Sequence, residues 1–357
     1  MIKNVKIKQF REHCKLSQEE LGQHIGVTRQ TIASWESGET VPELIHLFKI
    51  ASTLQIPVRL LIEDEEVQKK SKLLFRADDM TRLSVEIRKI INHKAQEYSS
   101  LEHLLGEFPG LPESRPLEAN DKNIIEQTAI SFRSWLGLGN LSCVYDLFML
   151  LENQGIKIIL YDLPEELSGF SCFTNDLGGF IVINKNHPIE RQYFTAIHEM
   201  GHLIFHRSHY DPTAVVKGKV PAHFESAVNL FAGKVLFPDN LVNLELHSYR
   251  DKWIPLPVLI DIKQRHFVSI QTILIRANQV GILSQKTFNA QFGSFKKKFD
   301  KEEPGTLKKE QTGLTRLERL TYRALVEEKI TISKAKEILG KPLSEIKKEL
   351  VSWMDQG

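Results

Sequence analysis

The chain has 357 residues, of which 41% are hydrophobic and 26% are charged, and this composition fits a globular protein of two or three domains. The formal net charge of +2 excludes a nucleic-acid binder that works by bulk charge, so any DNA contact must come from a local surface. The three cysteines lie far apart in the sequence, which fits a reducing cytoplasm and not a disulfide framework. We expect no signal peptide and no membrane contact, because no apolar run is long enough to span a bilayer.

The first part of the chain is predicted to form a small all-α domain of short helices. Ser17, with Glu20 three residues later, has the pattern of a capping box that starts a helix, and a glycine turn ends that helix. Thr28 is the expected cap of the next helix, which ends at Gly38. This order of helix, turn and polar-fronted helix is typical of a helix-turn-helix, in which the start of the second helix meets base edges.

The second helix of this pair supplies most of the predicted DNA contacts. We expect the residues that face the DNA groove to be Thr28, Arg29, Gln30 and Ser34. Gln18, at the start of the preceding helix, is expected to contact the DNA backbone or to support these residues. Arginine and glutamine carry the donors and acceptors that read guanine and adenine. The positive charge of this segment is weak, so one copy would bind weakly and we expect a dimer on a two-fold DNA site.

Beyond this domain the pattern changes to helices mixed with a few strands. The predicted strands are residues 155–160, 169–175 and 179–184. The predicted helices are two within 121–153, one each at 189–207 and 222–236, and several within 255–290. The resulting division is a helix-turn-helix domain at 1–62, a helical linker region at 63–119, a main domain at 120–295 and a helical C-terminal unit at 306–357.

The stretch from His198 to His202 reads H-E-x-x-H within an apolar, helix-compatible segment. Two histidines four residues apart lie on one face of a helix, about one turn apart, so both rings can reach one Zn²⁺ ion. Glu199 lies between them, where it can accept a proton from a water molecule at the metal. The pattern therefore predicts a metal-dependent hydrolase with Glu199 as general base.

A catalytic zinc ion needs a third protein ligand and an open position. A glycine three residues and a histidine six residues after the second histidine would supply it, but Phe205 and Ser208 stand there. The downstream candidates are His206, His209, Asp211, His223 and Glu225. His206 lies too far along the helix axis to join both histidines on one ion. We favour Glu225, near the start of the next predicted helix, with Asn229 one turn later to orient a zinc-binding histidine.

The expected reaction is hydrolysis of a peptide bond. Glu199 would accept the proton of the attacking water and pass it to the leaving amine. Such a site also needs a donor for the oxyanion that forms on the carbonyl. The sequence leaves that donor open among Tyr193, His206, His209 and Tyr210.

Two parts of the chain resemble known families. The segment SQEELGQHIGVTRQTIASWESG, within the first 62 residues, resembles the Xre/Cro-repressor helix-turn-helix family. Residues 120–290 resemble the ImmA/IrrE zinc metallopeptidases, through SGF at 168–170, the run ERQYFTAIHEMGHLIFH, and ESAVNLFAGKVLFP at 225–238. The resemblance implies a gluzincin-like site with Glu225 as the third ligand, and Ala227 departs from the acidic residue common at its place. It also implies cleavage of a Cro-like repressor.

The expected fold is α+β and mostly α. It combines an all-α helix-turn-helix domain, a gluzincin-like zinc-peptidase domain with a small β-sheet, and a helical C-terminal tail. The expected function is that of a cytoplasmic, DNA-binding transcriptional regulator whose zinc-dependent endopeptidase domain cleaves a repressor or antitoxin. The alternative is a transcription factor or antitoxin without proteolysis, whose zinc domain senses a ligand or partner.

Overall fold

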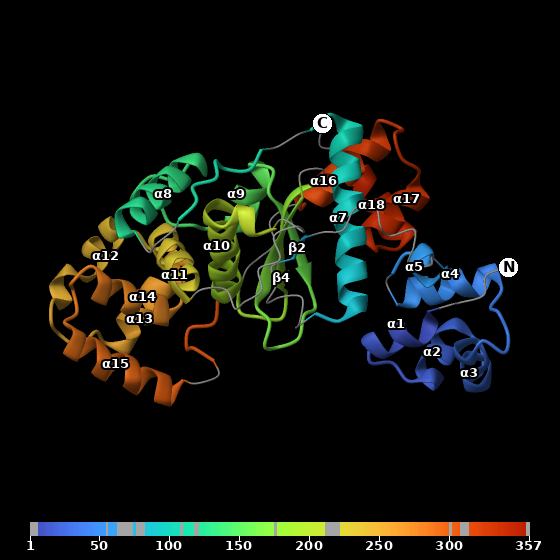
Figure 1. The fold of residues 1–357 in the computed structure, drawn as a ribbon, viewed down its shortest axis with the longest axis horizontal. Coiled ribbons are helices and arrows are strands. Elements are labelled where there is room, and N and C mark those ends of the chain that lie inside the picture. Colours follow the sequence, from blue (N-terminus) through green and yellow to red (C-terminus); the bar gives the residue numbers. More distant parts are fainter. Residues whose placement is uncertain are drawn as a thin grey trace. The chain divides into compact units, whose positions relative to one another are not determined.

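The computed structural model describes residues 6–54, 56–62, 74–75, 83–107, 110–117, 121–174, 177–210, 222–299, 302–307 and 314–354. The chain divides into two compact units, whose elements are labelled in Figure 1. The first unit comprises Met1–Leu73, Leu83–Phe108 and Leu314–Gly357, and the second comprises Leu74–Arg82 and Pro109–Gly313. Among the described helices, none is both long and apolar enough to cross a membrane.

The first unit begins with five short helices: α1 (Ile7–His13), α2 (Gln18–Ile25), α3 (Arg29–Ser37), α4 (Leu44–Thr53) and α5 (Val58–Ile62). The predicted capping box is present, since the Ser17 hydroxyl accepts from the Glu20 amide and the Glu20 carboxylate accepts from the Ser17 amide. Gly26 ends α2 with φ of 81°, a backbone conformation that favours glycine. Phe10, Leu21 and Ile32 are fully buried between these helices.

The described part of the first unit also contains α7 (Val85–Leu105), α16 (Arg316–Val326), α17 (Ile332–Leu339) and α18 (Leu343–Met354). Arg316 on α16 is buried and donates to the carboxylates of Glu102, at 2.6 Å, and Glu107, at 3.1 Å. This buried arginine needs acidic partners, and they come from a segment more than 200 residues earlier. The contacts thus join parts of the predicted linker region and of the predicted C-terminal unit into one body.

The second unit contains a four-stranded sheet in the order β1-β3-β4-β2. The strands are β1 (Leu74–Phe75), β2 (Lys157–Tyr161), β3 (Gly169–Thr174) and β4 (Gly178–Asn184). β3 pairs antiparallel with β1 and β4, whereas β2 pairs parallel with β4. The three strands predicted from the sequence are present, and the two-residue strand β1 was not predicted.

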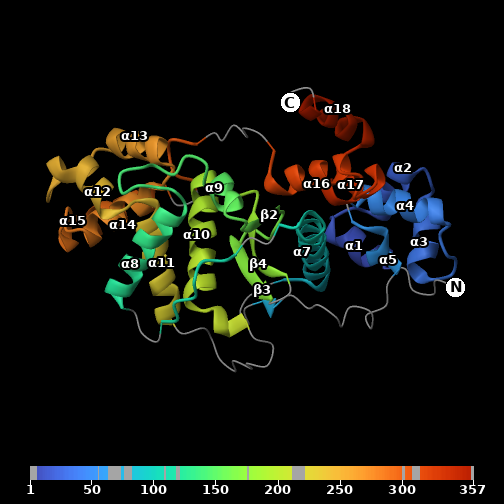
Figure 2. The same ribbon diagram turned by 90° about the horizontal axis from the view of Figure 1, so that it is seen from above.

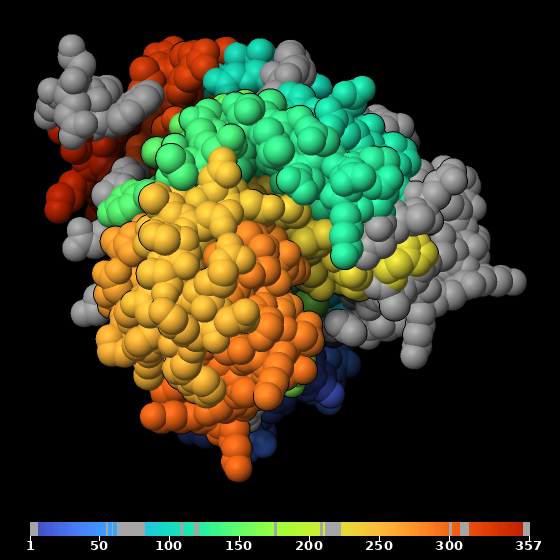
Figure 3. All heavy atoms as spheres, turned by 90° about the vertical axis from the view of Figure 1, so that its left-hand side faces the viewer, coloured from blue at the N-terminus to red at the C-terminus, as the bar shows by residue number. Residues whose placement is uncertain are grey.

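The described part of the second unit contains more helix than strand, so the fold is mostly α, as predicted. The helices are α8 (Lys122–Trp135), α9 (Leu147–Asn153), α10 (Ile189–Phe205), α11 (Ala222–Leu236), α12 (Asp239–Leu246), α13 (Leu256–His266), α14 (Ile270–Gln279) and α15 (Gln285–Lys298), with short 3₁₀ turns at Arg207–Tyr210 and His247–Tyr249. α10 lies between the sheet and α11, and it contacts β3, β4 and α11 (Figure 2). On the side seen in Figure 3, the helices from α12 to α15, in gold and orange, form one continuous surface beside α8, in green.

Two buried cationic side chains, on α13 and α8, form hydrogen bonds to α10 and α11. The fully buried Lys263 of α13 donates to Glu190, in the first turn of α10, at 2.5 Å. Arg133 of α8 donates to the carbonyl oxygen of Val235, near the end of α11, at 2.5 Å. Burial lowers the pKa of Arg133 to about 10. Both helices that carry the predicted metal ligands are therefore held by charged hydrogen bonds to neighbouring helices.

Candidate metal centre and nucleic-acid interface

Helices α10 and α11 pack closely where the predicted ligands lie, and Gly201 makes this possible. A methyl group on Gly201 would lie 3.0 Å from Cγ1 of Val228 and 3.2 Å from Cδ1 of Phe231, which is tighter than ordinary contact. Because glycine has no side chain, the backbone of α10 can approach α11 here. This approach brings the face of α10 with His202 against the first turns of α11, where Glu225 lies.

His198, His202 and Glu225 meet in one cluster. Nε2 of His198 lies 3.3 Å from Oε2 of Glu225, and Nε2 of His202 lies 3.4 Å from Oε1 of the same carboxylate. The two Nε2 atoms are 3.1 Å apart. All three ligand atoms lie within 4.8 Å of one another. The hydrogen bonds from the two histidines hold the pKa of Glu225 well below its usual range.

The outer nitrogens of both histidines also have defined partners. Nδ1 of His198 lies 3.0 Å from Oδ1 of Asn229, the residue predicted to orient a ligand. Nδ1 of His202 lies 2.9 Å from Nδ1 of His206, which is buried and stacks on Phe224. A nitrogen that donates to Glu225 must carry a proton, whereas a nitrogen that binds a metal ion must not. Metal binding would therefore need the tautomer with the proton on Nδ1, in which each histidine donates outward and its Nε2 lone pair is available to the ion. His206 thus lies behind the ligands, in keeping with its predicted distance from the cluster.

Glu199 lies next to the cluster and is held by a short chain of hydroxyl groups. The Ser171 hydroxyl, on β3, donates to Oε2 of Glu199 at 2.5 Å. Oγ of Ser171 also lies 2.6 Å from the hydroxyl oxygen of Tyr210. Glu199, Ser171 and Tyr210 are all buried. Sequence reasoning missed Ser171, because one serine in an apolar strand gives no local signal, although it directly follows the SGF block.

The remaining candidates from the sequence lie elsewhere or outside the described part of the structure. The Tyr193 hydroxyl donates to the carbonyl oxygen of Tyr145 at 3.1 Å, and burial raises its pKa, so it is engaged in the core. His223 is exposed and packs edge-on against Phe224. Asp211 lies outside the described residues, and so does the side chain of His209.

The predicted DNA contacts lie around the start of α3. Arg29 and Gln30, in the first turn of α3, are exposed. The Thr28 hydroxyl caps the helix by accepting from the Thr31 amide at 3.2 Å. Ser34 and Gln18 are half-buried and have partners within the domain.

Ser34 contacts another hydroxyl group, whereas Gln18 contacts a carboxylate that is part of an ion pair. The Ser34 hydroxyl lies 2.9 Å from that of Thr40. The Gln18 amide donates to Glu36 at 2.9 Å, and Glu36 also accepts from Arg11 at 2.6 Å. Gln18 therefore contributes to the contact between α2 and α3, whereas the side chains of Arg29 and Gln30 are exposed.

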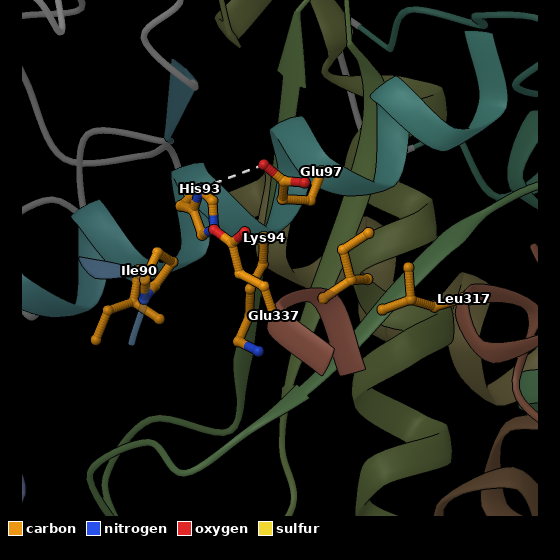
Figure 4. A pocket seen from close by; sticks show the side chains of 8 residues that line it. Ile90, His93, Lys94, Glu97, Leu317 and Glu337 are labelled. Carbon is orange, nitrogen blue, oxygen red and sulfur yellow. Dashed lines mark ion pairs between the residues drawn. The ribbon is translucent and has the colours of Figure 1, made fainter. Parts of the chain in front are cut away.

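A second histidine–carboxylate cluster lies in the first unit. His93 and Glu97 come from α7, and Glu337 comes from α17, and they line a cavity of about 20 Å³ (Figure 4). Each His93 nitrogen is 3.8 Å from one carboxylate. Nζ of Lys334 lies 2.7 Å from Glu97 and 3.1 Å from Glu337, so these carboxylates already have a cation beside them. We interpret this group as an ion-pair cluster that joins α7 to α17.

Comparison with known proteins gives a family match for the region with the predicted DNA contacts and for the region with the His198–Glu225 cluster. Residues 7–61 match the helix-turn-helix family, and residues 151–278 match the IrrE N-terminal-like domain of a peptidase family. The match at 7–61 covers α1 to α5. The match at 151–278 covers the strands β2 to β4, the cluster of His198, His202 and Glu225, and the helices up to α14.

Individual relatives match the N-terminal region. An uncharacterized HTH-type transcriptional regulator, YgzD of Bacillus subtilis, is 43% identical over 51 residues, which are 14% of this chain and 77% of that protein. A similarly described regulator of Methanothermobacter thermautotrophicus is 46% identical over 48 residues, or 13% of this chain and 70% of that protein. A crystal structure of Bacillus thuringiensis PlcR with the peptide PapR7 and DNA covers 97% of both chains at 11% identity, but its TM-score of 0.17 carries no structural argument.

Proposed function

Because the chain belongs to the helix-turn-helix family of transcriptional regulators and carries an IrrE N-terminal-like domain of metallopeptidase type, we propose that it is a zinc-dependent endopeptidase that controls transcription. Its substrate would be a repressor or antitoxin protein in the cytoplasm. The observation that carries this proposal is the cluster of His198, His202 and Glu225 with Glu199 beside it.

The residues of this cluster fit a zinc ion. Two imidazole nitrogens and one carboxylate form a ligand set used by catalytic zinc, and this set leaves a position open for water. Asn229 and His206 would keep the ligand nitrogens turned inward, as outer partners of zinc histidines do. When bound, zinc lowers the pKa of a water molecule and polarises a carbonyl group.

Glu199 would move the proton in the reaction. Its carboxylate accepts the proton of the water that adds to the peptide carbonyl, and gives it to the amide nitrogen that leaves as an amine. Ser171 donates to Oε2 of Glu199 and so fixes the orientation of this carboxylate. Tyr210 contacts the Ser171 hydroxyl, so through this contact it would position Glu199 indirectly, by holding the serine in place.

The DNA-binding part would act as a dimer. Helix α4 carries exposed apolar side chains, including Leu44 at 61% and Phe48 at 54%, with Val41 and Ile45 beside them. Exposed apolar clusters of this kind mark surfaces that bind another protein. A second copy of the same domain is the expected partner, since a helix-turn-helix reads a two-fold site as a dimer.

The decisive experiment incubates the purified full chain and Zn²⁺ with the products of neighbouring genes and measures intact masses. The expected result is two fragments whose masses sum to one substrate plus one water. Glu199→Gln should yield no fragments while it retains zinc, and the exposed Glu166→Gln should cleave normally as the matched control. Cleavage by Glu199→Gln would refute Glu199 as the base. Normal DNA binding without any cleavage would favour the alternative of a sensor or antitoxin.

A further inference from the structure

A segment of the chain itself lies at the sheet edge nearest the proposed base. β1 is the outermost strand on the β3 side of the sheet, with Leu74 opposite Phe173 and Phe75 opposite Cys172. The residue next to Cys172 is Ser171, whose hydroxyl donates to Glu199. β1 therefore pairs with β3, the strand whose Ser171 hydroxyl donates to Glu199, and Phe75 is paired with the residue next to that serine.

The free side of an edge strand is a binding surface for extended chains. Its unpaired N–H and C=O groups accept another strand, and this is how many domains bind peptides. Without β1, the edge of β3 would offer these groups next to Glu199. A peptide that is to be cut must lie extended near the base, so the edge of β3 is a suitable surface for it.

We propose that β1 is an internal competitor that occupies the edge of β3 and must leave before an extended segment of another protein can pair there. This inference rests on the proposed peptidase function and adds its regulation. An attached segment competes at an effective concentration in the millimolar range, well above that of a partner in solution. β1 is only two residues long and pairs on one side, so its release requires little free energy.

The position of β1 in the chain gives this competition a source of control. The first compact unit ends its N-terminal segment at Leu73 and resumes at Leu83, and β1 begins at the next residue after Leu73. The segment that blocks the edge is thus the direct continuation of the segment that carries the DNA-binding helices. Binding of DNA by those helices would therefore act on a segment that is continuous in sequence with β1.

A disulfide can test the pairing without any metal. Directly paired residues in antiparallel strands have Cα atoms about 4.5 to 5.5 Å apart, within the range of a disulfide. Phe75→Cys, in a chain with Cys14→Ser and Cys143→Ser, should form a disulfide with Cys172 on oxidation. Leu74→Cys in the same chain is the matched control, because its partner is Phe173. Equal cross-linking of both variants to Cys172 would overturn the proposal.

The competition itself is measured with a fluorescent synthetic peptide of residues 70–80, KSKLLFRADDM, and no zinc. The oxidised Phe75→Cys chain should bind it about tenfold more weakly, or worse, than the same chain after reduction. A double variant, Leu74→Pro with Phe75→Pro, lacks both β1 amide donors and should bind it about tenfold more tightly than the unmodified chain. Equal affinities, or no binding by any form, would overturn the proposal.

These outcomes separate this inference from the proposed function. The oxidised Phe75→Cys chain, in which the disulfide fixes β1 to β3, is compared with the same chain after reduction. Peptide binding by the reduced chain alone, with no cleavage of any protein, would refute the peptidase function and support the competition. Equal cleavage of the substrate by the oxidised and the reduced chain would refute the competition and leave the peptidase function intact.

Discussion

The two histidine–carboxylate clusters of this chain contain similar ligand atoms but differ in what surrounds them. Around His198, His202 and Glu225, the outer partners are the Asn229 amide and the His206 ring, which turn the ligand nitrogens toward one point. Around His93, Glu97 and Glu337, the Lys334 ammonium lies between the carboxylates and supplies the positive charge itself. The difference teaches that the neighbours of a cluster, more than its residue types, indicate whether it is arranged for a metal ion or for an ion pair.

The largest expected effect comes from removing a ligand. His202→Ala should lower zinc affinity on the order of a thousandfold, because two ligands cannot complete the site. His93→Ala should leave both the affinity and a stoichiometry of one zinc per chain unchanged. Titration against a chromophoric chelator measures both. Two zinc ions bound per chain, one of them lost in His93→Ala, would contradict the distinction between the clusters.

Removing an outer partner should have a smaller effect. Asn229→Ala should lower zinc affinity about 10- to 100-fold, because His198 loses the acceptor that fixes its ring and tautomer. Asn229→Asp keeps an acceptor oxygen and should stay close to the unmodified chain. The same chelator titration compares the two variants. An equal loss in both would indicate that Asn229 acts through packing and not as an acceptor.

The close contact of α10 and α11 gives a third prediction. Gly201→Ala would press a methyl group against Val228 and Phe231, so we expect the free energy of unfolding to fall by about 1 to 2 kcal/mol. Gly293→Ala, in the helix α15, meets nothing within 4 Å and should raise it by up to about 1 kcal/mol. Urea unfolding followed by circular dichroism measures both. Higher stability of Gly201→Ala would refute the close approach.

The smallest expected effect concerns the ion-pair cluster. Lys334→Gln should lower the free energy of unfolding of the first unit by about 0.5 to 1 kcal/mol, because Lys334 is partly exposed and solvent screens its charge. The difference should shrink as salt is added. Urea unfolding at low and high ionic strength is the measurement. A chain stabilised by this substitution would indicate that the cluster is not held by its lysine.

Local patterns predicted the parts of the site that lie close together in the sequence. His198, Glu199 and His202 follow from spacing on one helix, and Glu225 with Asn229 follows from the same spacing on the next. The structure brings these side chains together, and their metal binding remains a prediction. The helix caps at Ser17 and Thr28 were predicted for the same local reason.

Contacts between distant segments could not be predicted in this way. Ser171 reaches Glu199 from a strand 28 residues earlier, and Tyr210 reaches Ser171 from a short turn 11 residues after Glu199. Neither belongs to a periodic pattern with Glu199, and Tyr210 was predicted only as a candidate oxyanion donor. β1 is too short to show the alternation that marks a strand. The joining of α7 to α16 depends on which acidic residues a buried arginine finds, and that is decided by packing across the whole unit.

Arg133 gives the helix α11 two mechanically different ends. Its guanidinium group donates to the carbonyl oxygens of Val235, Gly139 and Ser142, and these hydrogen bonds fix the C-terminal end of α11. Glu225 lies ten residues away, about 15 Å along the axis, and its side chain is 43% exposed. The C-terminal end of α11 is thus held by hydrogen bonds from one arginine, whereas the end that carries Glu225 is held by the packing of Val228 and Phe231 against α10.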